Sequence, residues 1–330
     1  MTFAAQDAAS WLANPRATRE TLEAFGLATK HRLGQNFLVE DNIIRKIIRL
    51  AELTSDDVVL EVGPGLGTLT VAMLDYVRAV CSIEADRELE GVLATTCKEP
   101  HQDSFVLCMG DALKATPQLV GDAYASLGVF ADTQGKEASG ALIGPNKFVS
   151  NLPYQVAATL ILLFFQEFTT LEQAIVMVQA EVADRIAAKP GTKAYGAYTA
   201  KLALYAQVSG RFEVAPGNFM PPPRVNSAVV RLERAPMTDP SGTSVLTSEQ
   251  LAWVARVIDA AFAQRRKTIR NSMGASGFKK DTLERAFLAA HIEPTVRAEA
   301  LGVKDFVRLA MALAEGGAYG EETTFVHGRR

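Results

Sequence analysis

Short apolar runs of strand length alternate with longer runs of helical periodicity as far as about residue 235 of this 330-residue chain. Several of the short runs are rich in Val, Ile, Leu and Phe and predict buried strands, at 58–62, 79–86, 104–109 and 147–150. The run at 157–168 repeats its apolar residues at helical spacing and predicts a buried helix. Strands that alternate with helices in this way are typical of an α/β fold built on an open sheet.

The pattern changes in the last third of the chain. We predict a helix over 195–207, a short strand over 212–214 and a longer strand over 225–232. Residues 236–247 are rich in Pro, Gly, Ser and Thr and predict a linker, and the chain from Ser248 onward has helical periodicity. The sequence therefore predicts an α/β domain followed by a small C-terminal all-helical domain.

Composition at the two ends and in one internal stretch indicates the domain limits. Residues 1–29 have mixed charge and no signal-peptide pattern, and they predict an extension that lies on the surface or is disordered. Residues 120–145 are rich in Gly, Ala and small polar residues, which predicts a surface insertion. The polar, glycine-rich residues 317–330 predict a mobile tail. The α/β domain then covers 30–235 and the helical domain 248–316.

A glycine-rich turn follows the first predicted strand. Gly63, Gly65 and Gly67 allow a tight turn and a close approach of a ligand to the backbone, before a helix that begins at Thr68. Their G-x-G-x-G spacing is tighter than the G-x-G-x-x-G of dinucleotide sites, in which a pyrophosphate lies on the helix N-terminus. With Glu61 just before it, the turn favours a nucleoside cofactor without phosphates, namely S-adenosylmethionine.

Acidic residues follow the next two predicted strands. Glu84 lies about 20 residues after the glycine turn, at the position from which a carboxylate reaches ribose hydroxyls. Asp111 follows the third strand, where a carboxylate could accept a hydrogen bond from the adenine amine of the cofactor. Either residue alone would more often be a solvated acid at a strand end, so the prediction depends on the order of all three features.

The stretch Asn151-Leu152-Pro153-Tyr154 connects the fourth predicted strand to the helix at 157–168. In an open α/β sheet, loops at the carboxyl ends of strands bind ligands. The Asn151 oxygen and the carbonyl of Leu152 or Pro153 could accept both N–H groups of a base amine such as adenine N6 and localise its lone pair. Tyr154 could stack on the base. Taken alone, the stretch could also be an ordinary Asn/Pro turn.

Phe219 precedes a rigid segment, since Met220 and three prolines follow it and a proline restricts the residue before it. Enzymes that modify a base take it out of its stack and hold it between aromatic or apolar side chains. A rigid aromatic residue suits that role. The alternative is a core phenylalanine before a proline-rich loop, and without further information that alternative is preferred.

These motifs occur together, in the same order, in the rRNA adenine dimethyltransferase family, which the chain resembles from about Lys30 to Asn271. The matching segments are 30–38, 61–70, 151–154, 179–185, 195–196, 219–230 and 262–271. The resemblance implies a seven-stranded Rossmann-like methyltransferase core, with Phe219 facing Tyr154 across the target base. The residues implied to line the S-adenosyl-L-methionine site are Asn36, Leu38, Gly63, Glu84, Asp111 and Asn151.

The net charge of -3 argues mildly against a nucleic-acid partner, but the distribution of charge matters more than the total. One basic cluster occupies 30–32 and continues at 45–49. The second basic cluster comprises Arg265, Arg266, Lys267 and Arg270. A basic run on a helix is usually a solvated face. Because both clusters occur beside the motifs of a base-modifying enzyme, we expect a localised RNA footprint that includes the second cluster.

Cysteine and histidine usage bears on metals and on the compartment. Cys81, Cys97 and Cys108 are odd in number and lack metal-ligand spacing, so we expect buried free thiols in a reduced compartment. The 4 histidines form no cluster, and we expect no metal. The longest apolar stretch, 157–165, is too short to span a bilayer. We therefore expect a cytoplasmic protein without membrane contact, acting as a monomer.

The resemblance implies dimethylation of N6 of two adjacent adenosines in the 3′-terminal hairpin of 16S rRNA, within the small ribosomal subunit or its precursor. Two alternatives stay open: a 23S rRNA adenine N6-methyltransferase of the antibiotic-resistance type, and a ribosome-assembly factor without catalysis. The segments at 219–225 and 264–268 resemble the small-subunit group better. The presence of Glu84, Asp111 and Asn151 argues against a loss of catalysis.

Overall fold

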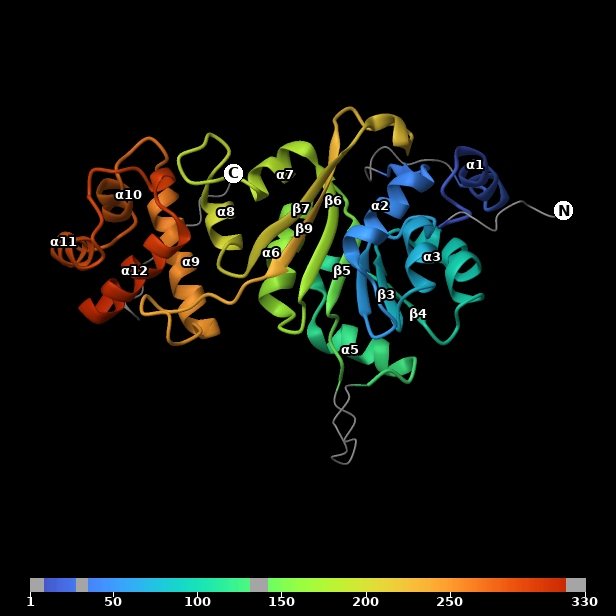
Figure 1. Cartoon of the computed structure of the whole chain (residues 1–330), viewed down its shortest axis with the longest axis horizontal. Helices are drawn as coiled ribbons and strands as arrows, with labels where there is room; N and C mark the ends of the chain where they lie inside the picture. The colour runs from blue at the N-terminus through green and yellow to red at the C-terminus, as the bar shows by residue number, and fades with distance from the viewer. Residues whose placement is uncertain (1–8, 28–34, 131–141, 319–330) are drawn as a thin grey trace. The chain divides into compact units, whose positions relative to one another are not determined.

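The computed structural model describes residues 9–27, 35–130 and 142–318 (Figure 1). Within them, a seven-stranded mixed sheet has the strand order β4-β3-β2-β5-β6-β9-β7. Its strands are β2 (Val58–Val62), β3 (Ala79–Glu84), β4 (Phe105–Met109), β5 (Lys147–Asn151), β6 (Gln173–Gln179), β7 (Ala206–Val214) and β9 (Ser227–Arg234). A separate antiparallel pair joins β1 (Phe37–Leu38) to β8 (Phe219–Met220). The predicted α/β class with seven strands is confirmed.

The strand order creates a switch point between β2 and β5. β2 pairs parallel with β3 on one side and with β5 on the other. β4 and β6 extend these two halves of the sheet, also in parallel. Connections that leave β2 in opposite directions open a crevice beyond the carboxyl ends of the strands, where ligands of α/β proteins bind. β9 runs antiparallel to β6 and brings Ser227 opposite Gln179 at this same edge.

Successive strand residues face two different helical layers, as expected for a sheet that is covered on both sides. Val149 belongs to a buried cluster with Ile44 of α2 and Met73 of α3. Its neighbour Phe148 faces the other layer, where its ring centroid lies 4.9 Å from that of Phe164 in α6. The helices of this α/β unit are α1 (Pro15–Ala24), α2 (Asp41–Ala51), α3 (Thr68–Leu74), α4 (Glu90–Leu93), α5 (Pro117–Ser126) and α6 (Ala157–Glu167) (Figure 1).

A buried lysine fixes the beginning of β5, at the end of the strand opposite to Asn151. Lys147 is 6 % exposed, and its ammonium lies 3.0 Å from Asp57 Oδ2. The ammonium also donates to the carbonyls of Ala51 and Glu52 at the end of α2, each at 2.8 Å. Removing one partner from a buried ion pair of this kind costs about 3–5 kcal/mol. The C-terminus of α2 and the starts of β2 and β5 are thereby held together.

The second unit is helical. Asp184–Gln207 form this compact unit together with the described chain from Ala235 onward, whereas the described residues up to Ala183 belong with Val208–Arg234 to the α/β unit. Its helices are α8 (Ala197–Leu202), α9 (Ser248–Phe262), α10 (Ile269–Ala275), α11 (Lys280–Ala289) and α12 (Val303–Leu313), and α7 (Ala180–Ile186) spans the division between the units. The Trp253 indole N–H donates to the Ala310 carbonyl at 2.8 Å, which joins α9 to α12.

The division differs from the predicted domain limits most clearly at residues 184–207. Residues 184–207 pack with the helical unit, whereas the sequence prediction assigned them to the α/β domain. The physical reason is that Tyr195 is buried and its hydroxyl donates to the Leu301 carbonyl at 2.9 Å. Sequence periodicity cannot reveal such a contact between residues 106 positions apart.

The N-terminal segment is better ordered than predicted. Residues 15–24 form α1, and the N-cap side chain of Asn14 accepts a hydrogen bond from the Ala17 N–H at 2.8 Å. Leu22 is buried in the same cluster as α2 and α3. The described part of the extension is therefore a surface helix with one buried face, and not a disordered segment. Residues 1–8 and 28–34 lie outside the described part of the chain. The second of these ranges contains residues 30–32 of the first basic cluster.

The predicted insertion and the predicted helix over 195–207 also need correction. Residues 120–126 belong to α5, in which Val120 and Tyr124 are fully buried. The helix ends at Leu202, and Ala206 already begins β7. Residues 131–141 of the insertion and 319–330 of the tail lie outside the described part of the chain.

Candidate active site

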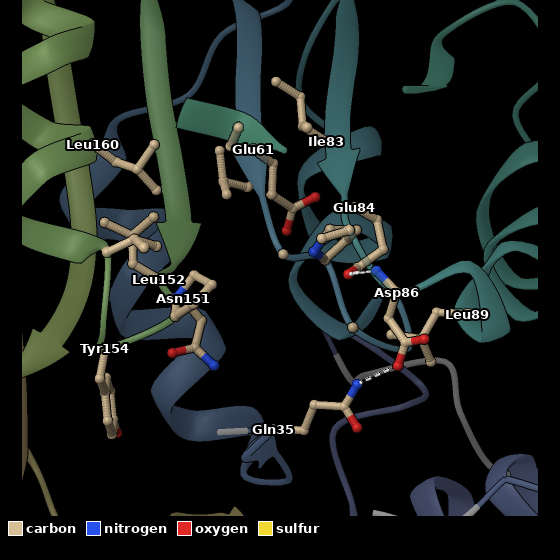
Figure 2. Close-up of a pocket in the computed structure, with 18 of the residues that line it drawn as sticks. Gln35, Glu61, Ile83, Glu84, Asp86, Leu89, Asn151, Leu152, Tyr154 and Leu160 are labelled. Atoms are coloured by element: carbon tan, nitrogen blue, oxygen red, sulfur yellow. Dashed lines mark hydrogen bonds between the residues drawn. The ribbon is translucent and has the colours of Figure 1, made fainter. Parts of the chain in front are cut away.

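A cavity of about 310 Å³ lies beyond the carboxyl ends of β2, β3, β4 and β5. This volume falls within the roughly 300–1,000 Å³ of small-molecule sites. Figure 2 shows the carboxylates of Glu61 and Glu84 and the amide of Asn151 around the same space. The cavity is lined by all six residues predicted for the cofactor and by the loop after β5, namely Asn36, Leu38, Gly63, Glu84, Asp111, Asn151, Leu152, Pro153 and Tyr154.

The glycine turn after β2 has positive φ at Gly63, Gly65 and Gly67, and the space around the first and the last of them also favours glycine. Gly63 has φ +68°, and a Cβ there would lie 3.3 Å from Pro153 Cγ. Gly67 has φ +90° at the N-cap of α3, and a Cβ there would overlap the Cys97 sulfur. Other residues rarely adopt such angles. The turn therefore brings the glycine backbone against Pro153, so that the two loops of the cavity are in contact.

Glu61 is a buried carboxyl group at the end of β2. It is 1 % exposed, and Thr70 Oγ1 and Ser82 Oγ both donate to its Oε2 at 2.7 Å. Burial raises the pKa of Glu61 to about 7, because the charged form loses its hydration, although the two hydroxyls act in the opposite direction. Glu61 therefore changes its charge near neutral pH inside the cavity.

The raised pKa of Glu61 makes stability depend on pH. In the unfolded chain the carboxyl loses its proton above about pH 4.5, but in the folded protein only near pH 7, so the stability of the wild type falls as the pH rises between these values. The free energy of unfolding of Glu61→Gln minus that of the wild type should increase by about 2–3 kcal/mol from pH 5 to pH 8. Urea unfolding across this range measures the difference. Glu90→Gln, at an exposed glutamate, is the matched control, and parallel curves for wild type and Glu61→Gln would exclude the shift.

Two further carboxylates lie at the ends of β3 and β4. Glu84 is 7 % exposed, and its Oε1 accepts a hydrogen bond from the Asp86 N–H at 2.9 Å. Burial raises the pKa of the Glu84 carboxyl, although hydrogen bonds from backbone N–H groups oppose this. Asp111 is exposed, and its Oδ1 accepts from the Leu113 N–H at 3.0 Å. The structure therefore brings both predicted acids to the cavity, one buried and one open to solvent.

Gln35 and Asp86 also line the cavity, and sequence reasoning assigned neither of them a role. Gln35 Nε2 donates to Asp86 Oδ2 at 2.9 Å, as drawn in Figure 2, so this contact joins the segment before β1 to the end of β3. A second acid two positions after Glu84 was the available signal for Asp86. Gln35 lies in the matching segment 30–38 of the family resemblance, but its contact with Asp86 spans 51 positions and could not be read from that segment.

Three residues of the stretch 151–154 make hydrogen bonds that hold it in place. Asn151 Nδ2 donates to the Asn36 carbonyl at 3.4 Å, and the Leu152 N–H donates to the Met177 carbonyl of β6 at 3.1 Å. The half-buried Tyr154 hydroxyl lies 2.6 Å from Ser227 Oγ. Desolvation raises the pKa of the Tyr154 phenol, so it is neutral near pH 7. The Asn151 amide thus faces the cavity from a loop with little freedom to move.

Phe219 is not brought to the cavity. It is 2 % exposed and pairs with Leu38 across the β1–β8 ladder, within the buried cluster of the α/β unit. The structure therefore shows Phe219 as a core residue, which was the alternative interpretation from the sequence. A role opposite Tyr154 therefore stays a prediction, and it requires Phe219 to become exposed when a base binds.

Arg265, Arg266 and Lys267 of the second basic cluster lie between α9 and α10 in the helical unit, and Arg270 lies in α10. Three side chains of the cluster are exposed, those of Arg265, Arg266 and Lys267. The Arg265 guanidinium lies 3.7 Å from Glu299, and that of Arg270 lies 2.9 Å from Glu284. Ion pairs at the surface contribute only about 0–1 kcal/mol. A phosphate could replace these carboxylates at little cost.

Metal chemistry has no support among the residues that the structure describes. They contain no group of three His, Cys, Asp or Glu side chains that could hold a metal ion. Cys81 and Cys97 are buried free thiols as expected, whereas Cys108 is partly exposed. No helix in the same described ranges is long and apolar enough to cross a bilayer.

The cavity suits a nucleoside cofactor that carries positive charge. Its described lining contains four acidic side chains, of which Glu61 has a pKa raised to about 7, and no lysine or arginine. Such a lining repels phosphate groups and attracts a cation, and S-adenosylmethionine carries a sulfonium and no phosphate. The seven-stranded sheet and this acidic cavity at its switch point define a Rossmann-like methyltransferase.

Comparison with known proteins narrows this class. The family described as ribosomal RNA adenine dimethylase matches residues 26–315, and the chain belongs to this family. It is 38% identical over 315 residues to the ribosomal RNA small subunit methyltransferase A of Kineococcus radiotolerans, covering 95% of each chain. It is also 38% identical over 302 residues to the Streptomyces coelicolor protein of the same name, covering 91% of this chain and 96% of that relative.

Solved structures agree on the fold. A dimethyladenosine transferase from Plasmodium falciparum superposes with a TM-score of 0.64 at 22% identity, covering 85% of this chain and 98% of that one. The 23S rRNA methyltransferase ErmE gives 0.59 at 23% identity, covering 84% and 100%. At these identities the likeness shows the fold alone. The prediction of an S-adenosyl-L-methionine-dependent rRNA adenine methyltransferase is confirmed by membership of the family.

Proposed function

We propose that this protein dimethylates N6 of two adjacent adenosines in the 3′-terminal hairpin of 16S rRNA during assembly of the small ribosomal subunit. The observation that carries the proposal is the Asn151 amide beside an acidic cavity suited to the cofactor. The choice of subunit is supported by relatives that are named small-subunit methyltransferases and are 36–38% identical over most of this chain. A 23S rRNA target has only the shared fold of ErmE in its favour.

The residues of the loop can activate a poor nucleophile without a strong base. The lone pair of adenine N6 is delocalised into the ring, and acceptors on both N–H groups localise it on nitrogen. Asn151 Oδ1 is one acceptor. The Pro153 carbonyl already accepts from the Val156 N–H at 3.2 Å, which favours the Leu152 carbonyl as the other. When bound, the cofactor supplies an electrophilic methyl group and is released as a neutral thioether. The proton lost from N6 passes to water.

The cofactor site supports a test that does not depend on RNA. Glu84→Ala should raise the Kd for both S-adenosylmethionine and its demethylated product by several-fold to about a hundredfold, since both carry the ribose that the carboxylate would bind. Isothermal calorimetry with each compound measures this. Glu84→Gln keeps an acceptor for the Asp86 N–H and should bind better than the alanine variant. Unchanged affinity of Glu84→Ala for both compounds would rule out the ribose contact.

The target itself is testable with labelled cofactor. The protein is incubated with methyl-labelled S-adenosylmethionine and small subunits that lack the modification, and the methylated nucleotides are mapped. We expect four methyl groups per subunit, two on each of two adjacent adenosines. Large subunits and free 23S rRNA are the matched controls. Label in 23S rRNA would favour the resistance-type alternative, and binding of small subunits without any label would favour an assembly factor.

The helical unit provides the second part of the proposal. Its exposed Arg265, Arg266 and Lys267 suit contact with rRNA phosphates, while the α/β unit holds the reacting base. We also propose cytoplasmic residence and action as a monomer, because the substrate is the assembling ribosome and the described cavity is built from one chain.

A further inference from the structure

The hydroxyl of Tyr154 has a partner from a distant part of the sequence. Its oxygen lies 2.6 Å from Ser227 Oγ, across a sequence separation of 73 positions. Ser227 is fully buried at the first position of β9, and its backbone is fixed by pairing with Gln179 of β6. The serine hydroxyl is therefore presented to Tyr154 from a rigid position in the sheet.

This contact completes the fixation of the Asn151–Tyr154 loop on three strands. At the start of the loop, Ser150 Oγ donates to the Val62 carbonyl of β2 at 2.6 Å. In the middle, the Leu152 N–H donates to the Met177 carbonyl of β6 at 3.1 Å. At the end, the side-chain contact to Ser227 of β9 holds Tyr154. The first two contacts fix the backbone, and the third fixes the direction of an aromatic ring.

We infer that Ser227 is a positioning residue for catalysis, which holds the Tyr154 ring in the orientation that aligns the target adenine with Asn151. This inference rests on the proposed function. Figure 2 shows Asn151 and Tyr154 on one side of the cavity and Glu84 and Asp86 on the other, so a base stacked on Tyr154 would present its edge to the Asn151 amide. A ring free to rotate would spread the base over many poses, and misalignment lowers the rate of the chemical step more than it lowers binding.

The contact also links the loop to the segment that carries Phe219. Arg224, Val225 and Asn226 immediately before Ser227 are exposed, and the Asn226 carbonyl accepts from the Ala180 N–H at 2.9 Å. Removal of the serine hydroxyl would leave this backbone pairing in place. Ser227→Ala is therefore expected to fold and to release the ring of Tyr154 alone.

A double-mutant cycle tests the inference in the full chain. Ser227→Ala and Tyr154→Phe each remove one side of the contact, and each should lower kcat by about 2–10-fold, as expected for one neutral hydrogen bond. The double variant should lose no more than either single variant, because the contact can be lost only once. KM for small subunits and Kd for S-adenosylmethionine should stay within about twofold of wild type. Additive losses, or an unchanged kcat for Ser227→Ala, would overturn the inference.

A control variant shows whether a loss of kcat comes from lost positioning or from lost stability. A second measurement tests the contact without relying on the proposed function. Thr18→Val removes a fully buried hydroxyl that donates to the Leu12 carbonyl, and it should lower Tm without changing kcat. Proton–carbon NMR of the free enzyme with labelled tyrosine should show changed ring signals of Tyr154 in Ser227→Ala but not in Thr18→Val. If wild type fails to methylate small subunits, the proposed function is wrong. Unchanged Tyr154 signals in Ser227→Ala refute the contact whatever the substrate.

Discussion

Replacing Asn151 with alanine is expected to slow methyl transfer by about a hundredfold or more while the fold and most of the affinity for RNA remain. In the proposed mechanism, the amide oxygen accepts an N–H of the target amine at the moment when the nitrogen gains positive charge. Loss of such an aligned group costs roughly 3 kcal/mol or more in the transition state. Single-turnover methylation of small subunits measures the rate of the chemical step directly.

Cofactor affinity has to be measured on the same preparation, because Asn151 also lines the proposed cofactor site. Gln155→Ala is the matched control, since it removes another amide that lines the cavity four positions further on and leaves the proposed acceptors in place. Its rate should stay within a few-fold of wild type. Near wild-type turnover by Asn151→Ala at saturating cofactor would refute the role of the amide.

The triple variant Arg265→Ala, Arg266→Ala, Lys267→Ala is expected to weaken binding to small subunits by at least about tenfold and to flatten its salt dependence. Each phosphate contact contributes about -0.7 to -0.9 to the slope of log affinity against log salt concentration. The slope should therefore fall by roughly one to three units, with no change in cofactor affinity. Binding titrations at several salt concentrations measure both quantities.

Two outcomes would contradict the RNA footprint. Arg265 already contacts Glu299, so the variant could lose Tm with an unchanged salt slope, which would mean that the cluster stabilises the helical unit instead. A control that replaces Lys279, Lys280 and Arg285 of the same unit by alanine removes the same charge from exposed positions. An equal loss of slope in this control would show an effect of net charge rather than of a local contact.

The strands that position the cavity could be predicted because they are buried on both faces. β2 is apolar except for Glu61, and β5 has Phe148 and Val149 at its centre, and short runs rich in such residues indicate buried parallel strands. Only residues 212–214 of the edge strand β7 were predicted as a strand, since most of its residues between Ala206 and Val214 are exposed or half-buried. Its conformation depends on pairing with the sheet, and the preceding helical spacing extended the predicted helix into it.

The position of a site residue could be predicted where that residue lies at the end of a strand. Its environment could not be predicted where residues distant in the sequence form it. The place of Glu84 and Asn151 at the cavity follows from their position at strand ends, whereas the roles predicted for them depended on the order of the motifs. The charge state of Glu61 depends on Ser82 and on burial, and the environment of Phe219 depends on pairing with Leu38. Local pattern contains no information on either contact, because each joins residues that are distant in the sequence.

The buried Lys147 has a consequence for how the chain tolerates change. A strand shifted by one residue would turn Asn151 to the opposite face of the sheet. Lys147 can reach Asp57 and the carbonyls at the end of α2 in only one alignment, and the neighbouring Asn146 side chain accepts from the Val58 N–H at 2.8 Å in that same alignment. We therefore expect that the connection that enters β5 can gain or lose residues without displacing the Asn151 amide, because contacts at the first residue of β5 set the alignment of the strand.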